Sequence, residues 1–356
     1  MANTKRNIYI DVMKGLLITL VVIGHLPYFE YDSRTLTLIY SFHMHAFLII
    51  GGILCHINEN TKLSNIILKR IKKTLLPYFV FYIISILFIP STTEQKINCV
   101  IVMFKGIGDP VHALNLPLWF LTFYFVAMTT YEIILWVSYK IFSKLFSKKN
   151  YKDIIVYLIT LVFISILMYI SYRYARYYKY PRVPFNVEIA WFCLLFVYIG
   201  NVAAKIIPDI FNTAKKNIFI VILSIIVLII CIAIWYTLSM RNGRIDLNAR
   251  DYKNALYMYI DAILGFIIFA TLSYPISKIP IINFIFKLFG ENSIYILAYH
   301  VPSVFISNAF ILPYLPLPIG IMLLQNSIPS IMILTSFGIL FSLIMAFIHK
   351  CIHFPA

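Results

Sequence analysis

The chain has 356 residues, of which 61% are hydrophobic and only 12% are charged. Most of such a chain cannot face water, so the composition excludes an ordinary soluble enzyme and predicts a polytopic membrane protein. The formal net charge of +16 fits attraction to anionic membrane lipid. The sequence shows no basic and aromatic module of a soluble nucleic-acid-binding domain, so we expect no nucleic-acid partner.

Apolar segments long enough to cross a bilayer recur along the whole length, separated by short clusters of Lys, Arg, Asn and Pro. They predict an all-α protein with one membrane-embedded domain over residues 1–356 and about ten transmembrane helices. In chain order we expect these helices at residues 8–28, 36–57, 75–90, 118–139, 153–172, 189–205, 217–238, 255–273, 290–312 and 328–349. The third and sixth are short, which predicts tilt, interruption or extension by flanking residues. Within residues 91–117, the apolar run I-N-C-V-I-V-M-F predicts an interfacial helix.

The basic residues predict the orientation of the chain. If the N-terminus is cytoplasmic, the inner segments carry more Lys and Arg than the outer ones, so we expect both termini in the cytoplasm. Two outer segments, R-Y-A-R-Y-Y-K-Y-P-R and M-R-N-G-R-I-D-L-N-A-R-D-Y-K-N, run against this trend. Their polar and aromatic groups suit either a sugar polymer or anionic lipid headgroups, and the sequence leaves both alternatives open.

The first predicted helix carries the most informative polar side chains, Asp11, Lys14 and His25. At about 100° per residue, Lys14 and His25 lie about 20° apart on one face and roughly 16 Å apart along the axis. A charged residue at membrane depth costs ~2.5–3.5 kcal/mol on the insertion scale, so such a stripe normally faces a protein-lined cavity and indicates a functional site. The alternative is a snorkelling lysine and a histidine at the helix end.

The five cysteines are scattered, mostly within or beside the predicted helices. Their spacing gives neither a metal-binding motif nor a disulfide framework. The histidines do not form a H-E-x-x-H motif. We therefore predict no metal site.

Several motifs follow one another along the predicted helices. The first helix has I-D-V-M-K-G and V-V-I-G-H, the second has Y-S-F-H-M-H-A-F, and K-R-I-K-K-T-L-L-P-Y begins at Lys69. P-L-W-F-L opens the fourth helix, and G-E-N-S-I-Y-I-L-A-Y-H opens the ninth at Gly290. In this order the motifs resemble the integral-membrane acyltransferase-3 family, whose bacterial members O-acetylate surface and secreted carbohydrates. Lys14 stands where many members have Arg, and a Lys lacks the bidentate fork.

This resemblance implies acetyl-CoA as the acyl donor and a hydroxyl of a cell-surface or secreted carbohydrate, free or lipid-linked, as the acceptor. It also implies a multi-pass protein of the bacterial cytoplasmic membrane, in contact with membrane lipid. The alternative is a non-catalytic transporter or export partner for polysaccharide. The oligomeric state stays open.

A hydroxyl is a poor nucleophile at neutral pH, so its attack on a thioester needs a base. A neutral histidine, with a reference pKa of about 6.5, suits this role. We assign it to His25, as general base or as a transient acyl carrier. His43 and Asp261 fall at a similar depth, so we expect one of them to orient the His25 imidazole. A helix-packing histidine and an interfacial carboxylate are the alternatives for these two residues.

On the cytoplasmic side we expect Lys14, Arg70 and Lys73 to bind the phosphates of CoA, with lipid headgroup contact as the alternative. Glu132 falls at the depth of Lys14, which predicts a buried ion pair that would compete with donor binding. The remaining candidates line the cavity or the acceptor site, with packing or a membrane-interface aromatic belt as the alternative. They are Asp11, Trp119, Glu132, Tyr295 and His300.

Overall fold

The computed structural model describes residues 7–26, 33–142, 149–178, 182–214, 218–310 and 328–351. Within these ranges the chain is helical and has no β-strand, which confirms the predicted fold class. The helices are α1 (Ile8–Gly24), α2 (Arg34–Ile53), α3 (Leu63–Arg70), α4 (Leu76–Phe88), α5 (Thr93–Lys105), α6 (Trp119–Phe142), α7 (Lys149–Tyr177), α8 (Val187–Phe192), α9 (Leu194–Ala214), α10 (Ile218–Asn242), α11 (Ala255–Ile276), α12 (Pro280–Glu291), α13 (Ser293–Phe310) and α15 (Ile328–Cys351).

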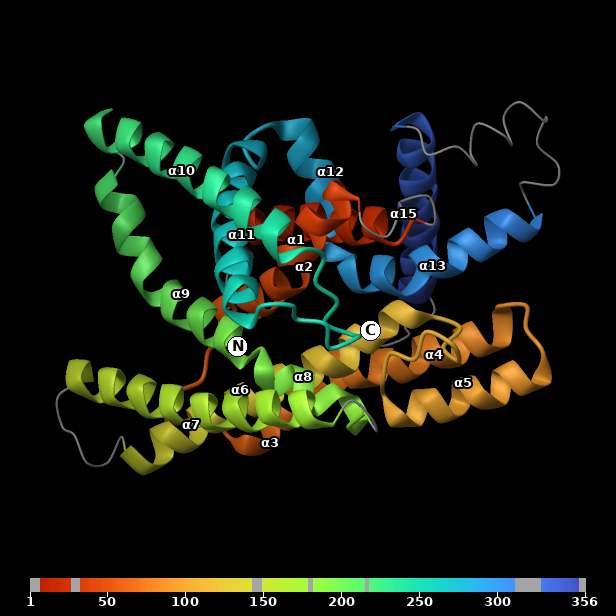
Figure 1. Cartoon of the computed structure of the whole chain (residues 1–356), viewed down its shortest axis with the longest axis horizontal. Coiled ribbons are helices and arrows are strands. Elements are labelled where there is room, and N and C mark those ends of the chain that lie inside the picture. Colours follow the sequence, from red (N-terminus) through yellow and green to blue (C-terminus); the bar gives the residue numbers. More distant parts are fainter. Residues whose placement is uncertain are drawn as a thin grey trace.

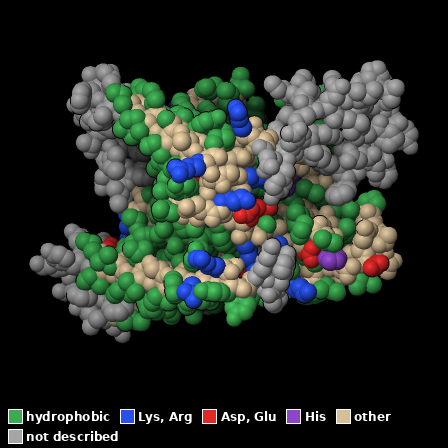
Figure 2. Space-filling view, viewed as in Figure 1, with side chains coloured by type: hydrophobic (Ala, Val, Ile, Leu, Met, Phe, Trp, Pro, Cys, Tyr) green, Lys and Arg blue, Asp and Glu red, His purple; other side chains and the backbone are tan. Residues whose placement is uncertain are grey.

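Seven helices of the described part are long and apolar enough to cross a membrane. The number rises to nine if each of two bent helix pairs is one span, namely Pro184–Phe192 with Leu194–Lys205 and Pro280–Glu291 with Ser293–Ser303. Figure 2 shows hydrophobic side chains spread over the visible face of the molecule, as expected for a surface that contacts lipid. The chain is therefore a multi-pass membrane protein, whereas ten spans and cytoplasmic termini stay predictions.

The third predicted helix, 75–90, begins too late. In the structure α3, a π-helical turn at Ile71–Leu75 and α4 form one span from Leu63 to Phe88. The basic cluster that starts at Lys69 consequently lies on a helix. Lys and Arg are good helix formers, but their charges lower the local hydropathy. A helix predicted from hydropathy therefore starts after the basic cluster.

The ninth predicted helix, 290–312, is also placed wrongly at its start. An additional helix, α12, begins at Pro280 and ends at Glu291, and the chain then bends by 82° before α13 begins at Ser293. Asn292 stabilises the bend, because its side-chain amide donates to the carbonyl oxygen of Leu288 at 2.8 Å. The helix expected within residues 91–117 is present as α5, which opens with a capping box.

The first helix, α1, lies in the interior of the molecule. It packs against α2, α11, α12, α13 and α15, and Figure 1 shows it in the middle of the view, with α4 to α7 along one side. Asn7 caps its start by accepting a hydrogen bond from the backbone of Tyr9 at 3.1 Å. A helix that is surrounded by protein can carry polar side chains that lipid would not tolerate.

Two glycines let α1 and α12 touch backbone to backbone. A Cβ on Gly290 would lie 1.8 Å from the carbonyl oxygen of Asp11, and a Cβ on Gly15 would lie 1.9 Å from that of Phe286. Small residues allow such close approach between membrane helices. Any side chain at either position would push the two helices apart.

We predict that Gly290→Ala lowers the free energy of unfolding by ~1–3 kcal/mol or more, the usual cost of forcing extra atoms into a packed interface. Thermal unfolding of the purified protein in detergent measures this change. Gly338→Ala is the control, because its new methyl would meet no atom closer than the Ser303 hydroxyl oxygen at 3.3 Å. That variant should lose far less stability, because the Ser303 hydroxyl has to shift by only a few tenths of an ångström and Ala favours a helix over Gly. Equal stability of the two variants would contradict the close crossing.

Candidate active site

His25 forms the end of α1 and faces a second histidine. Its Nδ1 lies 2.8 Å from the carbonyl oxygen of Val21, one turn earlier. The ring centroids of His25 and His300 are 5.1 Å apart, in an edge-on arrangement. His300 comes from α13, where its own Nδ1 lies 2.8 Å from the carbonyl oxygen of Ile296. The structure thus brings together His25 and one of the predicted cavity residues.

His43 of α2 approaches the same site. Its Nδ1 lies 2.6 Å from the carbonyl oxygen of Ile39, and it is within electrostatic range of His25. Tyr40, one turn earlier, has its ring centroid 5.0 Å from that of His43 and donates a hydrogen bond to the carbonyl oxygen of Gly24 at 3.3 Å. We name His25, His43 and His300 the histidine cluster.

All three rings of the histidine cluster are anchored in the same way, with Nδ1 against a backbone carbonyl of the preceding turn. A carbonyl oxygen only accepts, so in a neutral ring Nδ1 carries the hydrogen and Nε2 keeps its lone pair. The Nε2 of His300 is buried and has no hydrogen-bond partner among the described residues. A neutral imidazole with an available Nε2 lone pair is the form that accepts a proton from a hydroxyl.

Two residues that the sequence analysis did not single out reach the histidine cluster from the loop between α10 and α11, residues 243–254. The Arg244 guanidinium lies 4.2 Å from the ring centroid of Tyr40, and it acts electrostatically on both His25 and His43. Asp246 of the same loop also acts on His25. The available signal was the excess of Arg and Asp in this outer segment of the sequence.

Side chains from the two Arg-rich outer segments hold this loop in place. Arg250 forms a buried ion pair with Glu188 and donates to the carbonyl oxygen of Tyr178 at 3.2 Å. Arg182 donates to the side-chain oxygen of Asn248 at 3.1 Å. The two segments therefore lie together. These two arginines contact protein groups, however, so they position the loop that carries Arg244 and Asp246.

Asp261 does not orient the imidazole of His25. It is fully buried on α11, and its polar neighbour is Ser239 of α10, which is also fully buried. Neither of its carboxylate oxygens forms a hydrogen bond with His25 or His43. The backbone carbonyls described above orient the rings instead. The position of Asp261 along the chain does not specify the direction in which α11 turns its side chain.

Helices α3 and α6 are joined by a buried ion pair. Arg70 donates through Nε to Glu132 Oε2 at 2.8 Å, and its Nη2 contacts Oε1 of the same carboxylate. The Nζ of Lys69 lies 3.9 Å from Oε1. The predicted pair between Lys14 and Glu132 is wrong, because Lys14 binds Asp11 at 2.8 Å. The early start of α3 places Arg70 beside α6, which the predicted helix boundaries did not allow.

Lysines supply the accessible positive charge near this ion pair. Lys73 is exposed and lies within electrostatic range of Lys14, Lys69 and Arg70. The side chains of Lys69 and Lys14 are 42% and 22% exposed. Because Glu132 neutralises Arg70, the lysines are better placed than Arg70 to contact a phosphate group from solvent. Of the three residues predicted to bind the phosphates of CoA, Lys14 and Lys73 are therefore accessible to solvent, whereas Arg70 is paired with Glu132.

Trp119 and Tyr295 are packing residues. The Trp119 ring lies 5.5 Å from that of Phe123, centroid to centroid. Tyr295 lies 5.8 Å from Phe81 and 5.4 Å from His349. Both are buried away from the described contacts of the histidine cluster, so aromatic packing explains them.

A comparison with protein-family models decides the family. The acyltransferase-3 model, described as an acyltransferase domain, matches residues 7–347, which is essentially the whole chain. The chain belongs to the acyltransferase-3 family. Searches of curated proteins and of solved structures gave no match.

In this acyltransferase-3 protein, motifs that are far apart in the sequence meet in space. The first-helix motif contributes Gly15 to the contact with Gly290, which opens the ninth-helix motif. The ends of the same two motifs, His25 and His300, face each other. Lys14 lies roughly 16 Å from His25 along α1, so one helix joins the histidine cluster to the lysines near Arg70.

We predict that Arg70→Ala destabilises the protein by ~3–5 kcal/mol, because it leaves the buried Glu132 carboxylate without its partner. The double variant Arg70→Met with Glu132→Leu should recover most of this loss, since it removes both charges. Thermal unfolding and the monodisperse fraction in size-exclusion chromatography measure both. Normal stability of Arg70→Ala together with a loss of acetyl-CoA binding would instead assign Arg70 to the donor site.

Proposed function

We propose that this protein is a membrane O-acetyltransferase that moves an acetyl group from acetyl-CoA to a hydroxyl of a cell-surface or secreted carbohydrate. One observation carries the proposal: the buried helix α1 presents an anchored imidazole, His25, at one end and Lys14, beside further lysines, near the other. Membership of the acyltransferase-3 family supports the reaction class.

In the proposed reaction, Nε2 of His25 takes the proton of the acceptor hydroxyl while the hydroxyl oxygen attacks the carbonyl carbon of the thioester. The carbonyl opens to a tetrahedral oxyanion and re-forms as the carbon–sulfur bond breaks. The CoA thiolate leaves with the bonding electrons and takes the proton from the imidazolium. Transfer through a transient acetyl group on the same Nε2 is the alternative order of steps.

The charge around the histidine cluster suits these steps. The Arg244 guanidinium provides positive charge beside His25, and fixed positive charge favours an oxyanion that develops during acyl transfer. His300 packs against His25 and limits the positions that its ring can take. Anchoring the base before substrate arrives removes part of the entropic cost of reaching the transition state.

The two ends of α1 would serve the two substrates. The separation of roughly 16 Å between Lys14 and His25 is comparable with an extended pantetheine arm, so lysines at one end would hold the phosphates while the thioester reaches the histidine. We place the lysine end at the cytoplasmic face of a bacterial plasma membrane, with both termini inside, because acetyl-CoA is a cytoplasmic metabolite. The acceptor would then meet His25 near the outer face.

We predict that His25→Ala reduces acetyl transfer by roughly 10²–10⁴-fold, the usual range for the loss of general-base assistance, while the affinity for acetyl-CoA stays near normal. Acceptor acetylation and CoA affinity should be measured on the same monodisperse preparation. His112→Ala is the control, because His112 is an exposed histidine that pairs with Asp109 outside the cluster. Near-normal turnover of His25→Ala would eliminate the mechanism.

A second prediction concerns the donor. Lys73→Ala should weaken acetyl-CoA binding about tenfold, the effect of losing a charge-assisted contact of ~1.5 kcal/mol, with unchanged thermal stability because the side chain is exposed. Lys72→Ala is the matched control, since it removes an exposed charge from the neighbouring position. Isothermal titration of both variants at two salt concentrations measures the effect. Equal loss of acetyl-CoA affinity in the two variants would show that general surface charge, and not a contact of Lys73, causes the effect.

A further inference from the structure

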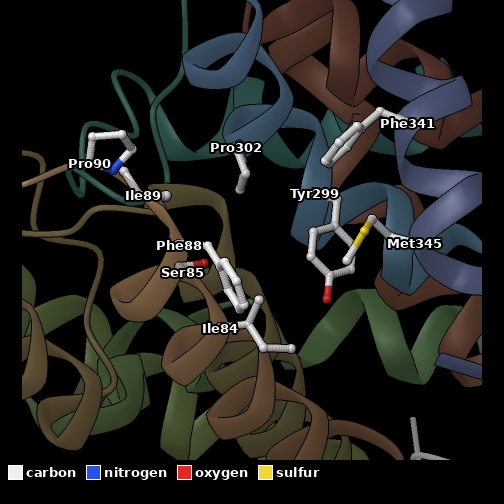
Figure 3. Close-up of a pocket in the computed structure, with 9 residues that line it drawn as sticks. All are labelled: Ile84, Ser85, Phe88, Ile89, Pro90, Tyr299, Pro302, Phe341 and Met345. Carbon is white, nitrogen blue, oxygen red and sulfur yellow. The ribbon is translucent and has the colours of Figure 1, made fainter. Parts of the chain in front are cut away.

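A cavity of about 240 Å³ lies between α4, α13 and α15 (Figure 3). Figure 3 shows Tyr299 between Phe88 of α4 and Met345 of α15. Phe88 is 75% exposed, so this end of the cavity meets the outer surface of the molecule. The lining residues are Ile84, Ser85, Phe88, Ile89, Pro90, Tyr299, Pro302, Phe341 and Met345.

The polar groups of the lining already have partners. Ser85 donates to the carbonyl oxygen of Phe81 at 2.8 Å and accepts a hydrogen bond from Asn115 at 3.0 Å. The Tyr299 hydroxyl lies 2.5 Å from Nε2 of His349. Water in the cavity would gain few hydrogen bonds, and apolar cavities of about 150 Å³ stay dry and bind small hydrocarbons. The chemistry of the cavity therefore selects a hydrocarbon chain.

The position of the cavity relative to the histidine cluster follows from the residues of α15 that contact each of them. A Cβ on Gly338 would lie 3.7 Å from Val22 and 3.9 Å from the Cβ of His300, so α15 passes the cluster at Gly338. Phe341 and Met345 follow three and seven residues later, which is about 5 and 10 Å along the axis. The cavity thus begins about one turn beyond the cluster, toward the C-terminal end of α15.

Helix α13 contributes to both the cavity and the histidine cluster. It presents Tyr299 to the cavity, and its next residue, His300, to His25. We propose that the cavity binds the hydrocarbon tail of a lipid-linked acceptor, an inference that rests on the proposed acetyltransferase function. The tail enters beside Phe88, and the head group stays nearer the level of His25. The membrane itself then delivers the acceptor to the reaction.

A photoreactive polyisoprenyl phosphate, with a diazirine in its tail, tests this proposal on the full chain in phosphatidylglycerol vesicles. Mass spectrometry after irradiation should locate the label on cavity residues such as Ile84 and Met345. An excess of unlabelled polyisoprenyl phosphate should remove this label, whereas the same excess of phosphatidylglycerol should not. Equal competition by the phospholipid, or label spread evenly over the lipid-facing helices, would overturn the proposal.

Variants that fill the cavity provide the control. Met345→Trp should reduce the cavity label about tenfold, because the larger side chain takes the space of the tail. Ile344→Trp is the matched variant, since Ile344 is 51% exposed on the outer side of the same helix, and it should leave the label unchanged. If Met345→Trp does not fold, Ile84→Trp against Ile83→Trp makes the same comparison from α4. Equal labelling within each pair would count against the cavity.

The labelling does not depend on acyl transfer. Acetyl-CoA hydrolysis by the same preparation reports on the proposed enzyme function. Specific labelling without acetyl-CoA hydrolysis would mean that the cavity binds a hydrocarbon tail but that the protein is not the proposed enzyme. The bound lipid would then not be an acceptor, and the proposal would be overturned. Hydrolysis without specific labelling would leave the enzyme function intact and refute the cavity proposal alone.

Discussion

The cost of placing the charged side chains of α1 inside a bilayer is the constraint on which the rest of the structure depends. Lipid would not tolerate Asp11 and Lys14, so the chain pairs them with each other and surrounds α1 with five other helices. The backbone contact between Gly15 and Gly290 lets α12 pack directly against α1 and complete the layer of helices around it. The helix that carries the candidate base is therefore held by protein on several sides.

Polar contacts determine which helices pair elsewhere in the molecule. Lipid is as apolar as a leucine side chain, so hydrophobic burial alone does not favour one helix neighbour over another in a membrane. Arg70 and Glu132 connect α3 to α6, and Asn201 of α9 accepts hydrogen bonds from Tyr131 and Tyr157 of two further helices. Each contact is satisfied only in one arrangement, so together they specify a unique fold.

The loop between α10 and α11 shows how structural ion pairs can serve a site without touching a substrate. Arg250 and Glu188 are both nearly inaccessible, and the loop around them has strained backbone, with φ of 59° at Arg250. This anchoring holds Arg244 and Asp246 against the histidine cluster. The positive and negative charges beside His25 thus come from a segment that a helix-by-helix description of a membrane protein would treat as a connection.

The sequence by itself determined the membrane class, the all-helical fold and the first helix, which carries Lys14 and ends at His25. These features are local, because composition and the 3.6-residue period need no knowledge of other helices. Only the tertiary structure decided that Arg70 pairs with Glu132 and that His300 faces His25. It also decided the bend before α13 and the cavity behind it. Such pairings depend on how helices cross and on the direction in which each is rotated, and depth along the sequence specifies neither.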